Sequence, residues 1–115
     1  MKPPIFILLL LIPLVSFSQT NILDSNIAYD ALTEQRTLSV FLSAGDGVSS
    51  VNVKLGSTYS ASDVLNSTYT VGTNITVTDN MLRVPLTLGN GEYFVMVTIT
   101  RTDASTQVME YKYTL

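Results

Sequence analysis

The feature that most constrains the fold is a two-residue alternation of apolar and polar side chains that recurs along most of the chain. In the segment 37–44, for example, Leu38, Val40 and Leu42 alternate with hydroxyl-bearing or aromatic residues. Because successive side chains of a β-strand point to opposite faces, this pattern predicts a strand with one buried face. No segment keeps helical spacing over the length of an ordinary helix. The sequence therefore predicts an all-β fold.

Seven segments carry this pattern, separated by turns rich in Gly, Asn and Asp. Pro85 has no N–H, so its strand is expected at a sheet edge or at a bulge. The Ser/Thr-rich segment 56–70 is expected to be irregular, with at most one helical turn at 60–65 capped by Ser60. Short strands at this spacing predict a seven-stranded antiparallel β-sandwich. The predicted strands are 22–29, 37–44, 49–55, 71–78, 81–88, 92–101 and 108–115.

The first 18 residues predict a cleavable signal peptide. Lys2 precedes an apolar run at 5–15, and Ser16 and Ser18 stand at the minus-three and minus-one positions of a cut after Ser18. A membrane-spanning helix needs about 20 apolar residues, so no membrane insertion is expected after cleavage. The peptide's last residues resemble those of Bacteroidota signal peptides. This resemblance implies a bacterial domain at 19–115 that is secreted, periplasmic or displayed at the cell surface.

Composition excludes several classes of chemistry. The chain has no His and no Cys, so it has no imidazole proton shuttle, no thiolate nucleophile and no disulfide. Residues 19–115 carry five basic and nine acidic side chains, hence a net charge of −4, which disfavours nucleic-acid binding. A pair of carboxylates could in principle serve a glycosidase, but a sandwich of this size has little room for a deep cleft. We therefore expect a protein that is not an enzyme and has no cofactor.

Three stretches, at 46–55, 86–93 and 95–103, resemble bacterial immunoglobulin-like and fibronectin type III-like extracellular domains. The resemblance implies an immunoglobulin-like β-sandwich. In such folds a Tyr at the start of the sixth strand commonly donates a hydrogen bond back to the preceding corner, and Tyr93 occupies that position. The Cys pair and core Trp of antibody domains are missing, so an immune role is not implied. Such domains serve adhesion, spacing, carbohydrate binding and assembly.

Immunoglobulin strand order would bring three acidic turns to one end of the sandwich, at Asp46, at Asp79 with Asn80, and at Asp103. Converging carboxylates suit Ca²⁺, and extracellular calcium sites can be weak. The alternative is that these are ordinary turn residues whose side chains bond to their own backbone. Both readings stay open at this point.

A candidate interaction surface lies on the outward face of the strand 92–101. There Phe94 and Met96 alternate with the core residues, and Lys54 and Lys112 are expected to flank them, together with Asn52 and Glu110. An apolar centre with a charged rim is typical of a modest protein interface, so the expected partner is another secreted or cell-surface protein, or a second copy. The alternatives are that segment 56–70 folds over the patch or that a bulge shifts the register.

Two other functions remain as alternatives. Tyr59 and Tyr69 could form a platform on which a sugar ring stacks, as in a carbohydrate-binding β-sandwich. The motif Gly91-Glu92-Tyr93, followed by the final strand, partly resembles the C-terminal sorting domains of type IX secretion. The leading expectation is a non-catalytic binding, adhesion or structural module.

Overall fold

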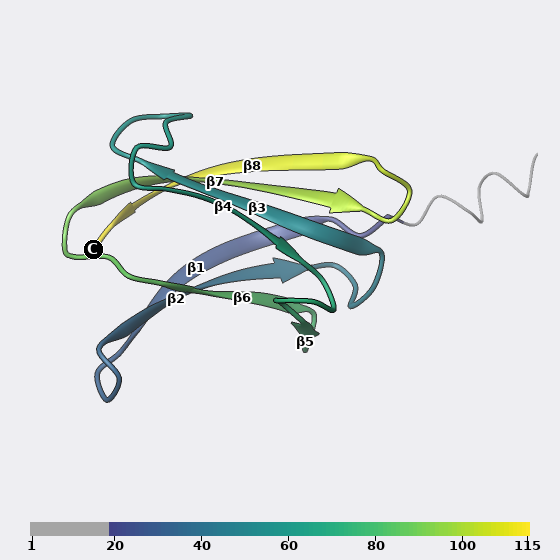
Figure 1. Ribbon diagram of the computed structural model, residues 1–115, viewed down its shortest axis with the longest axis horizontal. Helices are drawn as coiled ribbons and strands as arrows, with labels where there is room; N and C mark the ends of the chain where they lie inside the picture. The colour runs from purple at the N-terminus through teal and green to yellow at the C-terminus, as the bar shows by residue number, and fades with distance from the viewer. Residues whose placement is uncertain (1–18) are drawn as a thin grey trace, which may run out of the picture.

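The computed structural model describes residues 19–115, which form two four-stranded antiparallel sheets stacked face to face (Figure 1). The strand orders are β1-β2-β6-β5 and β4-β3-β7-β8. The predicted signal peptide lies outside the described residues. The strands are β1 (Ile22–Asp30), β2 (Gln35–Leu42), β3 (Val48–Gly56), β4 (Leu65–Thr70), β5 (Val77–Thr78), β6 (Met81–Leu86), β7 (Glu92–Arg101) and β8 (Thr106–Thr114).

The structure confirms the all-β prediction and corrects the strand count from seven to eight. The added strand is β4, where an irregular segment was expected, and the helical turn predicted at 60–65 is wrong. Leu65, Ser67 and Tyr69 alternate with more exposed polar residues along β4. Only one of these three residues is aliphatic, so β4 has no clear alternation of apolar and polar side chains in the sequence, although its Thr and Tyr residues favour strands. Of the predicted strand 71–78 only the last two residues form β5, while residues 72–74 are a turn closed by an isolated bridge between Val71 and Ile75.

The core consists of the inward faces of four central strands. The alternation in the sequence predicted these faces correctly, and each residue is at most 3% exposed. The two layers meet along these side chains, as expected for stacked sheets whose inner faces are apolar. They are Leu38, Val40, Leu42, Val51, Val53, Leu55, Leu82, Val84, Leu86, Val95, Val97 and Ile99.

Proline 85 lies at a sheet margin, as predicted. β5 pairs only with Met81 and Leu82, so β6 has a neighbour on one side alone at Pro85. A missing N–H therefore disrupts no hydrogen bond of the sheet there.

Polar contacts close the side of the sandwich where β1 of one sheet approaches β8 of the other. The hydroxyls of Ser25 and Tyr113 share a hydrogen bond, and the Ile22 backbone N–H donates to Gln107 Oε1 at 2.7 Å. The neighbouring Tyr111 hydroxyl is buried and has no hydrogen-bond partner among the described residues. Burial raises the pKa of both Tyr111 and Tyr113.

This tyrosine pair predicts a loss of stability in alkali. A raised pKa means that the folded state favours the neutral phenol, so its contribution is complete below about pH 10 and is lost as the pH rises through the folded-state pKa. Tyr113→Phe should cost about 1 kcal/mol at neutral pH, by removing the bond to Ser25, and should make urea stability fall less between pH 9 and 11. The exposed Tyr29→Phe is the control. If urea stability falls with pH in Tyr113→Phe as steeply as in the wild type, Tyr113 is not the source of the alkaline loss.

Candidate functional site

The outer face of the β4-β3-β7-β8 sheet brings together the side chains predicted to form an interaction surface. In the register of β7 with its neighbours, Phe94 lies opposite Lys112 of β8, while Met96 lies between Lys54 of β3 and Glu110 of β8. No register shift interrupts these rows. Lys54, Glu110 and Lys112 are therefore confirmed as neighbours, while Asn52 lies one row further along, opposite Thr98. Phe94 and Met96 are half-buried rather than exposed.

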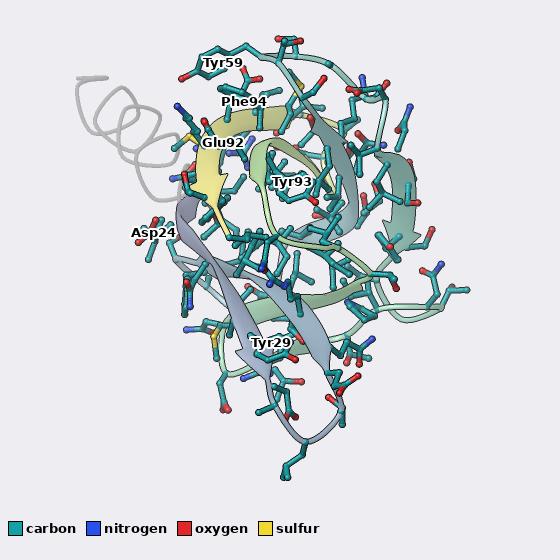
Figure 2. The ribbon with its side chains drawn as sticks, turned by 90° about the vertical axis from the view of Figure 1, so that its left-hand side faces the viewer. Asp24, Tyr29, Tyr59, Glu92, Tyr93 and Phe94 are labelled. Carbon is teal, nitrogen blue, oxygen red and sulfur yellow. The ribbon has the colours of Figure 1, made fainter. Side chains whose placement is uncertain are left out.

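The connection between β3 and β4, residues 57–64, covers part of this face. The ring of Tyr59 packs against Phe94 with 4.3 Å between ring centroids, and the Ser60 backbone N–H donates to the Glu110 carboxylate. Figure 2 shows Tyr59 and Phe94 together at one end of the molecule. The alternative in which this segment folds over the patch is thus confirmed for Phe94. We call Tyr59, Phe94, Met96, Lys54, Glu110 and Lys112 the outer-face patch.

The loop keeps Tyr59 largely in solvent while fixing its position. Asp63 accepts hydrogen bonds from the Ser57 backbone N–H at 3.0 Å and from its hydroxyl at 2.9 Å, which ties the two ends of the loop together. These bonds lower the pKa of the Asp63 carboxyl. Tyr59 itself is 64% exposed. The loop therefore presents one aromatic ring that packs against Phe94 on one side and is open to solvent on the other.

Both signs of charge border the ring of Phe94. Lys112 Nζ lies 5.7 Å from the ring centroid and 3.4 Å from Glu92 Oε1. Both members of this ion pair are about half exposed, so its contribution to stability is small. The pair instead gives the patch an exposed charged rim, where Lys112 and Glu92 could form ion pairs with a partner in place of the one between them.

Beyond Met96 the outer face becomes polar along β3 and β4. Asn52 Nδ2 donates to Asn66 Oδ1 at 3.1 Å and to Thr68 Oγ1 at 2.9 Å, which links β3 to β4 across the surface. The β3 and β4 side of the face is therefore polar here, while on β8 the exposed Val108, opposite Thr98, continues the apolar surface.

The three acidic turns lie at one end of the sandwich, but their carboxylates do not form a metal site. The Leu42 N–H donates to Asn80 O at 2.8 Å, and the Thr102 N–H donates to Gly47 O at 3.1 Å, so these turns adjoin one another. Across residues 19–115, however, no three acidic side chains, Asp46, Asp79 and Asp103 included, form a group that could hold an ion.

Asp103 behaves as an ordinary turn residue. It accepts hydrogen bonds from the backbone N–H and the hydroxyl of Ser105, at 2.9 and 2.6 Å, and these bonds lower its pKa. The alternative of local backbone bonding is confirmed for this residue.

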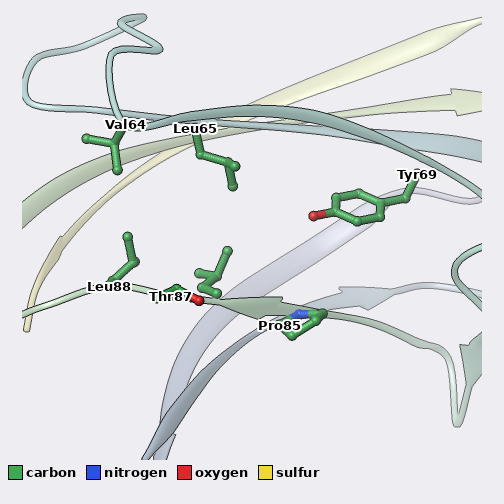
Figure 3. A pocket seen from close by; sticks show the side chains of 7 residues that line it. Val64, Leu65, Tyr69, Pro85, Thr87 and Leu88 are labelled. Carbon is green, nitrogen blue, oxygen red and sulfur yellow. The ribbon is translucent and has the colours of Figure 1, made fainter.

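Tyr69 lies on the opposite side of its sheet from Tyr59, so the predicted pair of stacking tyrosines is not brought together. Tyr69 packs against the core and borders a pocket of about 200 Å³ between β4 and β6 (Figure 3). No charged side chain lines this pocket, whose walls are Val64, Leu65, Tyr69, Pro85, Leu86, Thr87 and Leu88.

Tyr93 makes the corner contact that the sequence predicted. Its hydroxyl donates to the Gly89 carbonyl at 3.1 Å, four residues back along the chain. This bond fixes the path by which the chain leaves β6 and enters β7.

A buried arginine that sequence reasoning passed over fastens the start of the described chain. Arg101 is only 7% exposed, and it donates from Nε to Thr20 O at 2.7 Å, from Nη2 to Asn21 Oδ1 at 2.8 Å and from Nη1 to Ser105 Oγ at 3.2 Å. A lone basic residue at a strand end gives no sequence signal for burial, because two of its three partners lie some 80 positions away.

Comparison with known proteins identifies a fold and no family. No family model and no curated protein matches the chain. Two crystal structures of wild-type OgpA from Akkermansia muciniphila match 84% of it at 12% identity, with TM-scores of 0.53 and 0.52. The match spans 28% and 27% of the two OgpA chains, so this chain corresponds to less than a third of that protein. At this identity the likeness shows that the chain shares an all-β, two-sheet architecture with part of OgpA.

Proposed function

We propose that this chain is a non-catalytic, immunoglobulin-like binding module of a secreted, periplasmic or cell-surface protein, and that its outer-face patch contacts another protein. The strand order supports the immunoglobulin-like part of the proposal. Immunoglobulin domains place their first, second, fifth and fourth strands in one sheet and the third, sixth and seventh in the other, with an added strand beside the third in some types. With β4 as the added strand, both sheets here follow that order.

The observation that carries the binding proposal is the exposed Tyr59 ring, which packs at a tilt against the ring of Phe94. Tyrosine is enriched among the residues that dominate protein-interface energetics, because it buries a large area and loses little side-chain entropy. Packing on Phe94 restrains Tyr59 before any partner arrives, which lowers the entropic cost of binding.

The charges around the ring favour a protein partner over a polyanion. Lys54 and Lys112 alternate with Glu92 and Glu110 around the apolar centre, so the patch carries both signs. A mixed rim of this kind pairs with a protein surface of complementary pattern, whereas a phosphate backbone needs a basic cluster.

The natural partner is first isolated with the wild-type domain from the envelope or medium of its own cells. Tyr59→Ala should then weaken binding of that partner. We expect a loss of about 30-fold, typical of a central aromatic anchor. The matched control is Tyr29→Ala, which removes another exposed tyrosine at the far end of the molecule (Figure 2). Unchanged affinity for Tyr59→Ala, measured by calorimetry on folded protein, would contradict the proposal.

A sugar ligand is the competing use of the same ring. If the wild-type domain binds on a glycan array and Tyr59→Ala does not, the patch serves carbohydrate recognition instead of protein binding.

A further inference from the structure

The sandwich has four strands at sheet margins, and three of them carry a feature that hinders pairing with another strand. β5 is only two residues long and is followed along the same margin by Pro85 of β6, β1 has a register shift between Ile22 and Asp24, and β4 is only six residues long. Such features are the usual protection of natural sheet edges. β8 spans nine residues without proline, glycine or a register shift, and within residues 19–115 it pairs only with β7 (Figure 1).

The hydrogen bonds at the end of β8 show which of its backbone groups are free. The N–H groups of Gly91 and Leu115 each donate to the other's carbonyl, and the Arg101 N–H donates to Ser105 O. Because bonded and non-bonded pairs alternate in antiparallel sheets, the odd-numbered residues of β8 turn their backbone groups to β7. The even-numbered residues turn theirs to the open edge, and these are Thr106, Val108, Glu110, Lys112 and Thr114.

The charges of the even-numbered side chains favour one partner for the free edge, which is β8 of a second copy. If two copies of β8 pair antiparallel about a twofold axis at Tyr111, Glu110 of each copy lies opposite Lys112 of the other. Both are even-numbered, so their free backbone groups bond in the same register. A twofold axis at Glu110 would also match the backbone groups, but it would set two carboxylates directly opposite, which is destabilising.

We infer that the free edge of β8 is a homodimer interface, at which two copies of this chain join their β4-β3-β7-β8 sheets into one continuous eight-stranded sheet with Glu110 facing Lys112. The interface is isologous, so it closes at two copies and leaves no exposed β8 edge. It rests on a different observation from the proposed function, the open margin of the sheet, but the two surfaces share Glu110 and Lys112. Tyr59→Ala separates them, because it should weaken partner binding and leave the dimer intact.

Charge reversal tests this interface by sedimentation velocity over a concentration series. Glu110→Lys and Lys112→Glu each put like charges opposite one another and should weaken the dimer about tenfold. The double variant restores opposite charges and should recover wild-type affinity. A wild-type chain that stays monomeric at millimolar concentration, or a double variant no better than the single ones, would overturn the inference.

A cysteine scan tests the register, because the chain has no cysteine of its own. Tyr111→Cys sets two thiols across the twofold axis in a non-bonded pair, where Cα atoms lie about 4.5 Å apart. It should form a disulfide dimer under mild oxidation. Met109→Cys, which faces Tyr113 of the other copy, should not. Efficient crosslinking of Glu110→Cys in place of Tyr111→Cys would show the rejected register and overturn the charge argument.

Discussion

Arg101→Leu is expected to lower the free energy of unfolding by about 3 kcal/mol. The guanidinium is buried and donates to Thr20, Asn21 and Ser105. Hydrogen bonds from charged donors contribute about 1.5 to 3 kcal/mol each, and their loss leaves the Thr20 carbonyl buried without its partner. The segment before β1 should then detach from the end of β7. Urea unfolding measures the loss, and hydrogen exchange at residues 20–22 locates it.

The matched control for this prediction is Arg83→Leu. Arg83 is exposed on β6 and makes no ion pair among residues 19–115, so its removal should change stability by less than about 0.5 kcal/mol. Arg101→Lys should recover only part of the loss, because an ammonium cannot reproduce the planar fork of three donors. Equal stabilities of Arg101→Leu and Arg83→Leu would show that the buried contacts add nothing.

Gly56→Ala is expected to cost about 2 kcal/mol and to displace the loop that carries Tyr59. A methyl group at Gly56 would lie 2.5 Å from the backbone oxygen of Ala61, and a contact that short forces the loop away. Since Tyr59 depends on the loop for its place on Phe94, partner binding should weaken together with stability.

Gly89→Ala provides the comparison. No atom lies within 4 Å of the space that its methyl group would fill, so we expect no loss and even a small gain from the stiffer unfolded chain. Thermal melts and partner titrations of the two variants form one experiment. A Gly56→Ala protein with wild-type stability would show that the close approach of Ala61 does not hold the loop.

The strands with a clear two-residue alternation could be predicted from the sequence, and so could the face of the sheet on which each of their side chains lies. Alternation placed Val95 and Val97 in the core and Phe94 and Met96 outside, because the two-residue period of a strand is fixed by its geometry. The corner bond of Tyr93 was also predictable, since its donor and acceptor are only four residues apart.

Features that depend on contacts between distant segments could not be predicted in this way. The burial of Arg101 requires Thr20 and Asn21, which lie at the other end of the chain. The placement of Tyr59 requires a loop to turn back over Gly56, and nothing in a Ser/Thr-rich segment specifies that turn. The same limit explains why the sequence left both a calcium site and ordinary turn residues open for the three acidic turns, whereas among residues 19–115 their carboxylates form no group that could hold an ion.

The direct test of the central claim is photo-crosslinking in the cells that make this protein. A photo-crosslinking aromatic amino acid placed at position 59 should capture one protein partner. The same group at position 29, which is also exposed (57% against 64%) but lies near the tip of the β1–β2 hairpin, should capture none. Capture from position 29 with none from position 59 would contradict the claim that the outer-face patch is the binding surface.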